Sequence, residues 1–196
     1  MTSMPQLDEA PAGDLPPPAV FFGGCSWGCI YHIGVYEGLL RRFDGHKGLA
    51  DVVWGGSSSG AICALGAALQ MTTEEVRDIY DTLASMARRY GVFNKMSIYH
   101  AIVLERLLPD GGPEHKALRG RLHIGVTRAW SNALISDWES NRELRDIMHC
   151  SMHIPFYMNH TKPLPDGSRA IDGGFTANLA SIGTLPTCTV DVFSDL

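Results

Sequence analysis

The sequence contains little charge and no excess of positive charge. Charged residues account for 19% of the 196 residues, below the roughly 25% that is usual in soluble proteins. The 16 Lys and Arg against 21 Asp and Glu give a formal net charge of −5. Because a protein that binds a phosphate backbone needs a basic surface, we expect no nucleic-acid partner.

The cysteines lack the spacing of a disulfide framework or a structural zinc site. They number five and contain no CxxC pair, which favours a reducing compartment. His149 and His153 are four residues apart, but Cys150 stands where a metalloprotease motif requires a glutamate. We therefore expect no metal site.

The sequence also lacks the patterns of a secretory signal and of a membrane-spanning segment. Residues 1–18 hold five prolines and three acidic residues but no Lys or Arg, so they are predicted to be a disordered lead-in rather than a secretory signal. The longest apolar stretch, residues 61–71, is shorter than the ~20 residues that cross a bilayer. We expect a cytoplasmic protein that is free or peripheral on a membrane or lipid-droplet surface. The sequence indicates no oligomeric state.

Strands and helices alternate in the first third of the chain. Residues 19–22 and 51–54 are short apolar runs closed by paired glycines, which is typical of buried strands. Residues 30–43 and 59–70 follow them with the apolar spacing of helices. This alternation indicates an α/β fold, and the chain length favours one domain over residues 19–196.

The rest of the chain is predicted to add supporting elements. Two capping boxes, Thr72 with Glu75 and Ser140 with Glu143, mark helix starts. The predicted helices cover residues 72–90, 97–108 and 141 to before Pro155, and the predicted strands cover 121–128, 170–171 and 189–193.

The segment from Gly56 to Gly60 has the pattern G-x-S-x-G between a predicted strand and a predicted helix. A sharp strand-to-helix turn exposes its central side chain, and the small residues at either end permit that turn. The positive end of the following helix points at the same position. Ser58 is therefore the predicted nucleophile, and Gly56 and Gly60 are the predicted elbow glycines.

A serine hydroxyl needs a base to accept its proton. The last histidine is His160, so no histidine follows Asp172, and a triad in the order Ser, Asp172, His is excluded. Asp172 follows a short predicted strand and precedes two glycines that permit close approach to the serine turn. We predict Asp172 as the base. An earlier acid paired with His149, His153 or His160 is the alternative.

The ordered set of motifs resembles the patatin-like phospholipase family. The matching segments are a glycine-rich segment at residues 23–28, the serine motif at 56–60 and Asp-Gly-Gly at 172–174, and the likeness runs from about Val20 to about Leu179. The resemblance implies a three-layer α/β/α sandwich with a mostly parallel central sheet. It also implies a lipid acyl hydrolase that works through a Ser-Asp dyad and an acyl-enzyme, with a lipid ester as substrate and with no metal or cofactor.

The same resemblance assigns the oxyanion hole to backbone N–H groups of the first segment. The residues concerned are Gly23, Gly24, Cys25, Ser26 and Gly28. When the segment is aligned with the animal lipase branch, two of the family's usual glycines fall at Ser26 and Cys29. We expect a side chain at Ser26 to restrict the geometry of this turn.

Two other functions fit the same residues. The first is a lipid-binding or scaffolding protein that keeps the fold but is catalytically impaired by its altered oxyanion segment. The second is a serine esterase that acts on small soluble esters. Labelling of Ser58 by a serine-directed phosphonate tests the first, and a rise in rate when the substrate forms micelles tests the second.

Overall fold

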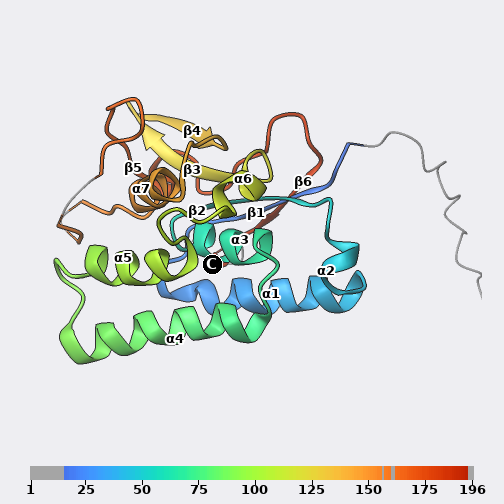
Figure 1. Cartoon of the computed structure of the whole chain (residues 1–196), viewed down its shortest axis with the longest axis horizontal. Coiled ribbons are helices and arrows are strands. Elements are labelled where there is room, and N and C mark those ends of the chain that lie inside the picture. The colour runs from blue at the N-terminus through green and yellow to red at the C-terminus, as the bar shows by residue number, and fades with distance from the viewer. Residues whose placement is uncertain (1–15, 156, 160–161, 194–196) are drawn as a thin grey trace, which may run out of the picture.

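The computed structural model describes residues 16–155, 157–159 and 162–193, which form a six-stranded sheet in the order β4-β3-β2-β1-β6, with β5 paired to β3 (Figure 1). The strands are β1 (Ala19–Phe22), β2 (Val53–Ser57), β3 (Leu122–Arg128), β4 (Ser131–Ile135), β5 (Ile171–Asp172) and β6 (Thr187–Val190). Strand β1 is parallel to β2 and β6, and β2 is parallel to β3. Strands β4 and β5 are antiparallel to β3. The sheet is therefore mixed.

The pairing of the strands brings distant segments to one edge of the sheet. In the β1–β2 register Phe22 lies opposite Gly56, so the glycine-rich segment after β1 and the serine turn after β2 begin side by side. Strand β3 extends along the same edge, where Val126 pairs with Asp172 of β5. The carboxyl ends of parallel strands are where α/β proteins build their sites.

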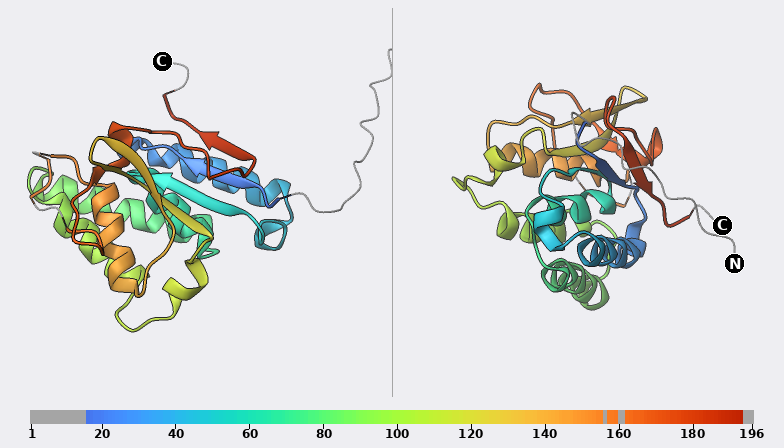
Figure 2. Two further views of the ribbon diagram at one scale, coloured as in Figure 1. Left: turned by 90° about the horizontal axis from the view of Figure 1, so that it is seen from above. Right: turned by 90° about the vertical axis from the view of Figure 1, so that its right-hand side faces the viewer.

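Most of the hydrophobic core lies between the sheet and the helices on one of its faces (Figures 1 and 2). Helix α3 is the most central, with eight of its ten residues buried. The helices are α1 (Cys29–Arg42), α2 (Gly45–Gly48), α3 (Ser59–Ala68), α4 (Thr73–Tyr90), α5 (Met96–Leu107), α6 (Glu114–Leu118) and α7 (Asn141–Ser151), with short 3-10 helices η1 (Ser26–Gly28) and η2 (Gly173–Phe175).

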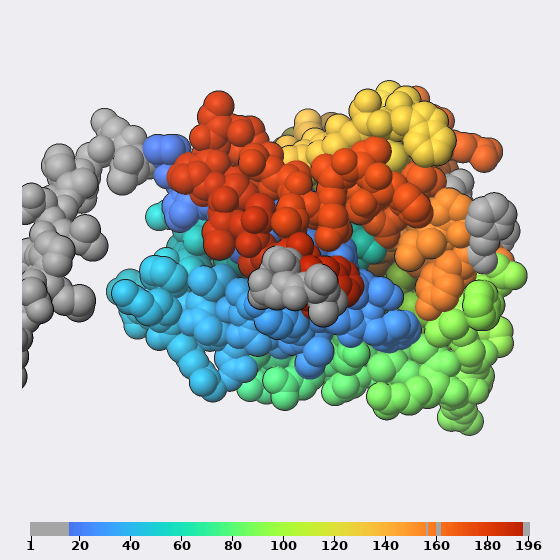
Figure 3. Space-filling view, turned by 180° about the vertical axis from the view of Figure 1, so that it is seen from behind, coloured from blue at the N-terminus to red at the C-terminus, as the bar shows by residue number. Residues whose placement is uncertain are grey.

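The opposite face of the sheet is covered by an irregular segment, residues 176–186. Ala180 and Ile182 of this segment form a second, smaller hydrophobic cluster with Ala19, Phe21 and Val53 of the sheet. In the view from behind, this part of the chain (red) lies above α1 (blue) (Figure 3). Both faces of the sheet are thus buried, which explains why β1 and β2 are apolar on both sides.

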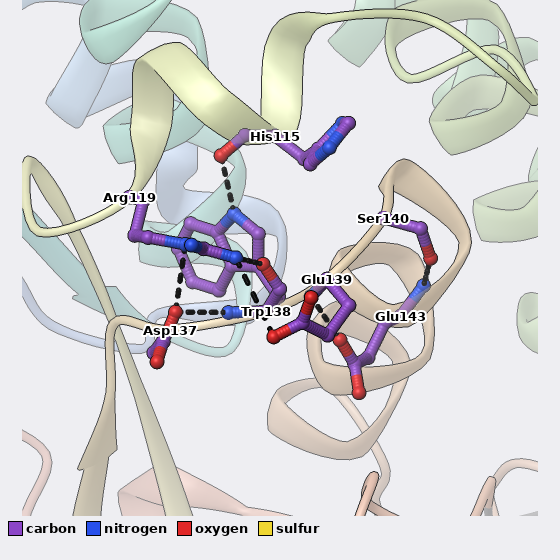
Figure 4. A network of polar contacts seen from close by, with 7 residues as sticks. All are labelled: His115, Arg119, Asp137, Trp138, Glu139, Ser140 and Glu143. Carbon is purple, nitrogen blue, oxygen red and sulfur yellow. Dashed lines mark hydrogen bonds and ion pairs between the residues drawn. The ribbon is translucent and has the colours of Figure 1, made fainter.

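A network of polar contacts holds the start of α7 (Figure 4). The Arg119 guanidinium pairs with Asp137 at 2.7 Å, and the indole N–H of Trp138 donates to the His115 carbonyl at 2.8 Å. Ser140 Oγ accepts the Glu143 N–H at 3.2 Å. Because Trp138 is buried, these contacts fix the position from which α7 runs toward the serine turn.

The structure confirms the predicted α/β class, with helices flanking a mixed sheet. The Thr72–Glu75 capping box is present in full, whereas Glu143 accepts the N–H of Glu139 in place of that of Ser140. The last strand was predicted at 189–193 and is found at Thr187–Val190, directly after Pro186. Elements α2, α6 and β4 were not predicted. Residues 1–15 of the predicted lead-in lie outside the described residues.

Candidate active site

Ser58 lies at a sharp turn between β2 and α3. Its backbone angles are φ 54° and ψ −131°, a conformation that L-residues adopt at a cost of about 1–3 kcal/mol and that is concentrated at functional sites. The side chain is 8% exposed, and Ser58 is the N-cap residue of α3. The N-terminus of this helix therefore faces any negative charge that develops at the serine.

Glycines around Ser58 allow the backbone to approach very closely. A Cβ at Gly56 would lie 2.5 Å from the Gly60 backbone, and one at Gly60 would lie 2.2 Å from the Phe22 carbonyl oxygen. A Cβ at Gly24 would lie 2.8 Å from the Ser58 Cβ. Real Cβ contacts are longer than these, so each of the three positions requires glycine. The glycine-rich segment after β1 therefore lies directly against Ser58.

Asp172 is held rigidly beside the same edge of the sheet. Its backbone N–H donates to the His153 carbonyl at 3.0 Å, and its own carbonyl accepts from Thr127 Oγ1 at 2.8 Å. Its carboxylate Oδ1 accepts the Gly174 N–H at 2.8 Å. The side chain is buried, with 5% of the residue exposed.

The Ser58 side chain lies close enough to the Asp172 carboxylate to influence its pKa. Burial raises the pKa of Asp172 above its ordinary value of 3.8, and the hydrogen bonds from Ser58 and the Gly174 N–H oppose that rise. A carboxylate with a raised pKa is a better proton acceptor. The fold thus brings the serine and the aspartate, 114 positions apart in the sequence, to the same edge of the sheet.

The predicted oxyanion segment already uses several of its N–H groups. Gly24 donates to Asn178 Oδ1 at 2.7 Å, and Cys25 donates to Ser59 Oγ at 3.1 Å. Gly23 donates to the Val190 carbonyl and Gly28 to the Cys25 carbonyl, both at 2.9 Å.

Ser26 differs from the other four residues of this segment. No acceptor for its N–H lies among the described residues. Its φ is 52°, in the left-handed region that favours glycine. The side chain at Ser26 was expected to restrict the turn, and the backbone here adopts the left-handed conformation despite it.

Ser151 is a part of the site that the sequence did not reveal. Its Oγ accepts the Ser58 N–H at 3.0 Å and donates to the Gly125 carbonyl at 2.7 Å. This one hydroxyl bridges the serine turn to β3, and no motif marks it in the sequence. The capping box that begins α7 was the only signal for the helix that carries it.

A narrow cavity of about 60 Å³ opens beside Ser58. Its lining includes the three serines Ser26, Ser58 and Ser59 and is otherwise mostly apolar. The apolar lining is Trp27, Ile62, Tyr80, Leu83, Met96, Met152, Ile154, Tyr157 and Met158, to which Cys29 and His100 are added. An apolar cavity with a few convergent polar groups is the usual form of a small-molecule site.

The Cys25 thiol beside the serine turn is not a competing nucleophile. Cys25 Sγ lies 3.3 Å from Ser59 Oγ and 3.6 Å from His32 Nδ1. Burial raises the pKa of the Cys25 thiol and lowers the pKa of His32 to about 4. Both groups are therefore neutral at pH 7, and the pair is not the thiolate and imidazolium that cysteine catalysis requires.

The alternative of a histidine base stays a prediction. His153 is buried, and its carbonyl accepts the Asp172 N–H. Burial lowers the pKa of His149 to about 4, and His160 lies outside the described residues. Among the described residues, no group of three or more His, Cys, Asp or Glu side chains is placed to hold a metal ion. In the same part of the chain, every helix is too short or too polar to cross a membrane.

The family described as "Patatin-like phospholipase" matches residues 20–181, which is most of the chain. The chain belongs to the patatin-like phospholipase family. The match begins in β1 and ends beyond Asp172, so it includes both residues of the pair described above.

Curated relatives of this patatin-like chain have names that describe lipid acyl chemistry. The human protein "1-acylglycerol-3-phosphate O-acyltransferase PNPLA3" is 30% identical over 88% of this chain and 37% of the relative. The human "Patatin-like phospholipase domain-containing protein 2" is 30% identical over 89% of this chain and 36% of the relative. The mouse "Omega-hydroxyceramide transacylase" is 27% identical over 91% of this chain and 30% of the relative.

The patatin-like chain therefore spans about a third of the length of these relatives, from 30% to 37%. Their names describe both cleavage of lipids and transfer of acyl groups. Lipid acyl hydrolases and acyltransferases are thus the enzymes to which this chain is similar.

Proposed function

We propose that residues 19–196 form a catalytic domain that cleaves carboxylic ester bonds of phospholipids or acylglycerols. The observation that carries this proposal is the placement of Ser58, at a strained strand-to-helix turn, beside the buried carboxylate of Asp172. The family match and the apolar cavity beside Ser58 support a lipid as the substrate.

In the first half of the proposed reaction, Asp172 accepts the proton of the Ser58 hydroxyl as Ser58 Oγ attacks the acyl carbonyl carbon. The tetrahedral intermediate collapses when the ester C–O bond breaks. The departing alcohol takes the proton from Asp172, and the acyl group stays on Ser58 as an ester. In the second half, Asp172 accepts a proton from water, the resulting hydroxyl attacks the acyl-enzyme, and Ser58 regains its proton as the fatty acid leaves.

The negative oxygen of each intermediate needs backbone donors. Ser26 supplies an N–H that is not committed to a described acceptor. The residue after a nucleophile at a strand-to-helix turn commonly supplies a second, and here that residue is Ser59 at the start of α3. Cys25 becomes a third donor if Ser59 Oγ releases its N–H. Removal of one such donor costs about 10²–10³ in rate.

A serine-directed fluorophosphonate tests the nucleophile directly. We expect one covalent adduct, which peptide mapping places on Ser58 among the three consecutive serines 57–59. Ser58→Ala removes the adduct and the hydrolysis of lipid esters. Ser57→Ala is the matched control, since Ser57 is fully buried and its Oγ has no described partner. An adduct on Ser57 or Ser59, or full activity in Ser58→Ala, overturns the mechanism.

The occupied N–H groups favour a second function, a catalytically impaired lipid-binding or scaffolding protein. Gly24 and Cys25 both donate to side chains of the protein itself. Such a protein would bind a fluorescent fatty acid in the cavity yet leave Ser58 unmodified by the fluorophosphonate. The labelling experiment thus separates the two functions, and a test with soluble short-chain esters separates lipid hydrolysis from a general esterase.

The names of the relatives include acyltransferases as well as a phospholipase, so either water or an alcohol could accept the acyl group. An alcohol that replaces water in the second half of the reaction converts hydrolysis into acyl transfer without any change in Ser58 or Asp172. Incubation of the protein with a labelled lipid ester and a second, unlabelled lipid alcohol measures the ratio of free fatty acid to newly acylated alcohol.

A further inference from the structure

Large apolar side chains are exposed where α4 ends and α5 begins. Tyr90 is 52% exposed, Phe93 is 73% exposed and Ile98 is 56% exposed. All three lie within nine residues, around the turn between the two helices at an outer edge of the molecule (Figure 1). Clustered apolar side chains on a surface mark a site of contact with a protein or a lipid, whereas single ones need no explanation.

The same segment carries positive charge only. Residues 82–104 contain Arg88, Arg89 and Lys95 but no Asp or Glu, in a chain whose net charge is −5. None of these three cations forms an ion pair with a carboxylate in the described part of the chain. By contrast, Arg41 pairs with Glu37 and Arg106 pairs with Asp78. We call Arg88, Arg89, Tyr90, Phe93, Lys95 and Ile98 the α4–α5 face.

The α4–α5 face adjoins the cavity beside Ser58. The Phe93 ring meets the ring of Tyr157, which lines the cavity, at a centroid distance of 5.9 Å. Met96, directly after Lys95, also lines it. A groove of about 370 Å³ with Arg88, Ala84, Ala87 and Val92 in its wall shares Trp27 and Tyr80 with the cavity.

We propose that the α4–α5 face docks on an anionic lipid surface and so presents the cavity to its substrate, a proposal that rests on the lipid ester hydrolysis proposed above. Aromatic and aliphatic side chains enter the boundary between headgroups and acyl chains, while arginine and lysine bind anionic headgroups. Three cations without a carboxylate partner among the described residues, around three exposed apolar side chains, match the charge and polarity of that boundary. A lipid leaving the surface then passes Arg88 and the groove on its way to Ser58.

The chain offers a closely matched control on α1. Arg41, Arg42 and Phe43 repeat the sequence pattern of Arg88, Arg89 and Tyr90. Both pairs place a guanidinium over the neighbouring ring, Arg42 at 5.5 Å from the Phe43 centroid and Arg89 at 5.2 Å from that of Tyr90. Arg41 is paired with Glu37, and these residues lie at the far end of α1 from the serine turn (Figure 1).

The test measures sedimentation of the protein with phosphatidylcholine vesicles that contain or lack phosphatidylserine. We expect binding only with phosphatidylserine and release by salt. Arg88→Ala, Arg89→Ala and Lys95→Ala each lower the partition coefficient about fivefold, and the triple variant about 100-fold. Phe93→Ser lowers it about tenfold. Arg41→Ala, Arg42→Ala and Phe43→Ser change it less than twofold.

Two further readouts keep the docking surface separate from the chemistry. Variants of the α4–α5 face lower activity on phosphatidylserine-containing vesicles but keep the turnover of a soluble short-chain ester, which also shows that they are folded. We expect Ser58→Ala to bind vesicles like the wild type. If the wild-type protein binds vesicles but hydrolyses no lipid ester, only the proposed reaction is disproved, and the docking surface stands. Equal vesicle binding by the triple variant and the wild type overturns the proposed surface. A change of oligomeric state in Phe93→Ser, seen by light scattering without a change in vesicle binding, also overturns it.

Discussion

Ser151 Oγ accepts a hydrogen bond from the backbone N–H of Ser58 at 3.0 Å and donates one to the Gly125 carbonyl at 2.7 Å. The two serines are 93 positions apart, and Ser151 ends α7 while Ser58 caps α3. The turn that carries Ser58 is therefore held by a hydroxyl from a distant helix.

Ser151→Ala tests this support. It leaves the buried Ser58 N–H and Gly125 carbonyl without their bridging hydroxyl, and we expect the free energy of unfolding to fall by about 1–3 kcal/mol. We also expect slower phosphonylation of Ser58, because the serine turn loses its anchor. Urea titration and the rate of fluorophosphonate labelling measure the two effects. Ser97→Ala is the control, since Ser97 Oγ has no described partner, and a loss of stability equal to that of Ser151→Ala would contradict the assignment.

Ser26→Gly tests the strain in the glycine-rich segment. Ser26 has a φ of 52°, which costs an L-residue roughly 1–2 kcal/mol, whereas glycine adopts it freely. We expect the variant to gain up to about 1 kcal/mol in the free energy of unfolding, because added entropy of the unfolded chain offsets part of the relief. The same exchange in the helix α4, Ser85→Gly, should lose about 0.5 kcal/mol. If thermal denaturation shows that both substitutions lower the melting temperature equally, the backbone of Ser26 is not strained.

Asp172→Asn is expected to raise the stability and lower the activity of the protein. Burial raises the pKa of Asp172, so the folded state holds its proton more tightly than the unfolded state. This contribution to stability is complete below the ordinary pKa and is lost as the pH rises through the raised one. At pH 7 the ionised, buried carboxylate therefore destabilises the folded state, whereas the neutral amide of asparagine does not. The variant should melt at a higher temperature and hydrolyse esters about 10²–10⁴-fold more slowly.

Asp166→Asn is the matched control for the expected rise in the melting temperature of Asp172→Asn. Asp166 is exposed, and hydrogen bonds from Ser168 lower its pKa. Its ionised form is therefore favoured by folding, and its replacement should not raise the melting temperature. Equal increases in both variants would show that loss of net negative charge, not burial of Asp172, causes the effect.

The buried His100 should make the protein sensitive to acid. Burial lowers its pKa from 6.5 to about 3, with a further effect from His149. The unfolded imidazole therefore binds a proton at a higher pH than the folded one does. The free energy of unfolding should fall by about 1.4 kcal/mol per pH unit as the pH drops between those two values. His100→Phe removes this contribution, so urea titrations at several pH values should show a shallower slope. If the free energy of unfolding depends on pH equally in the variant and the wild type, His100 does not cause the sensitivity to acid.

The sequence was sufficient to predict the elements that carry Ser58 and Asp172. Strand β1 is a continuous apolar run followed by glycines, so it was readable without tertiary information. Strand β2 was predicted at 51–54 and is found at Val53–Ser57, because Gly55 and Gly56 continue the strand in place of ending it. Ser58 and Asp172 were identified because each is followed closely by glycine at a strand end. Their roles in catalysis stay predictions.

Strand β4 escaped prediction because its turn breaks the usual rule for hairpins. The two residues between β3 and β4 are Ala129 and Trp130, with φ of 48° and 62°. Hairpin turns with two positive φ values normally hold Asn-Gly or a similar pair, and neither residue here gives that signal. The hydrogen bond from Gly24 to Asn178 was equally hidden, because it joins residues 154 positions apart through a fold that no local pattern encodes.

That bond has a practical consequence for anyone who modifies this protein. Asn178 belongs to residues 176–186, the irregular cover of the sheet's second face, yet its amide oxygen grips the loop that touches Ser58. Truncations or solubility-enhancing substitutions in that cover are therefore expected to disturb the loop beside Ser58. A shortened or re-surfaced version should be designed to keep this one amide in position.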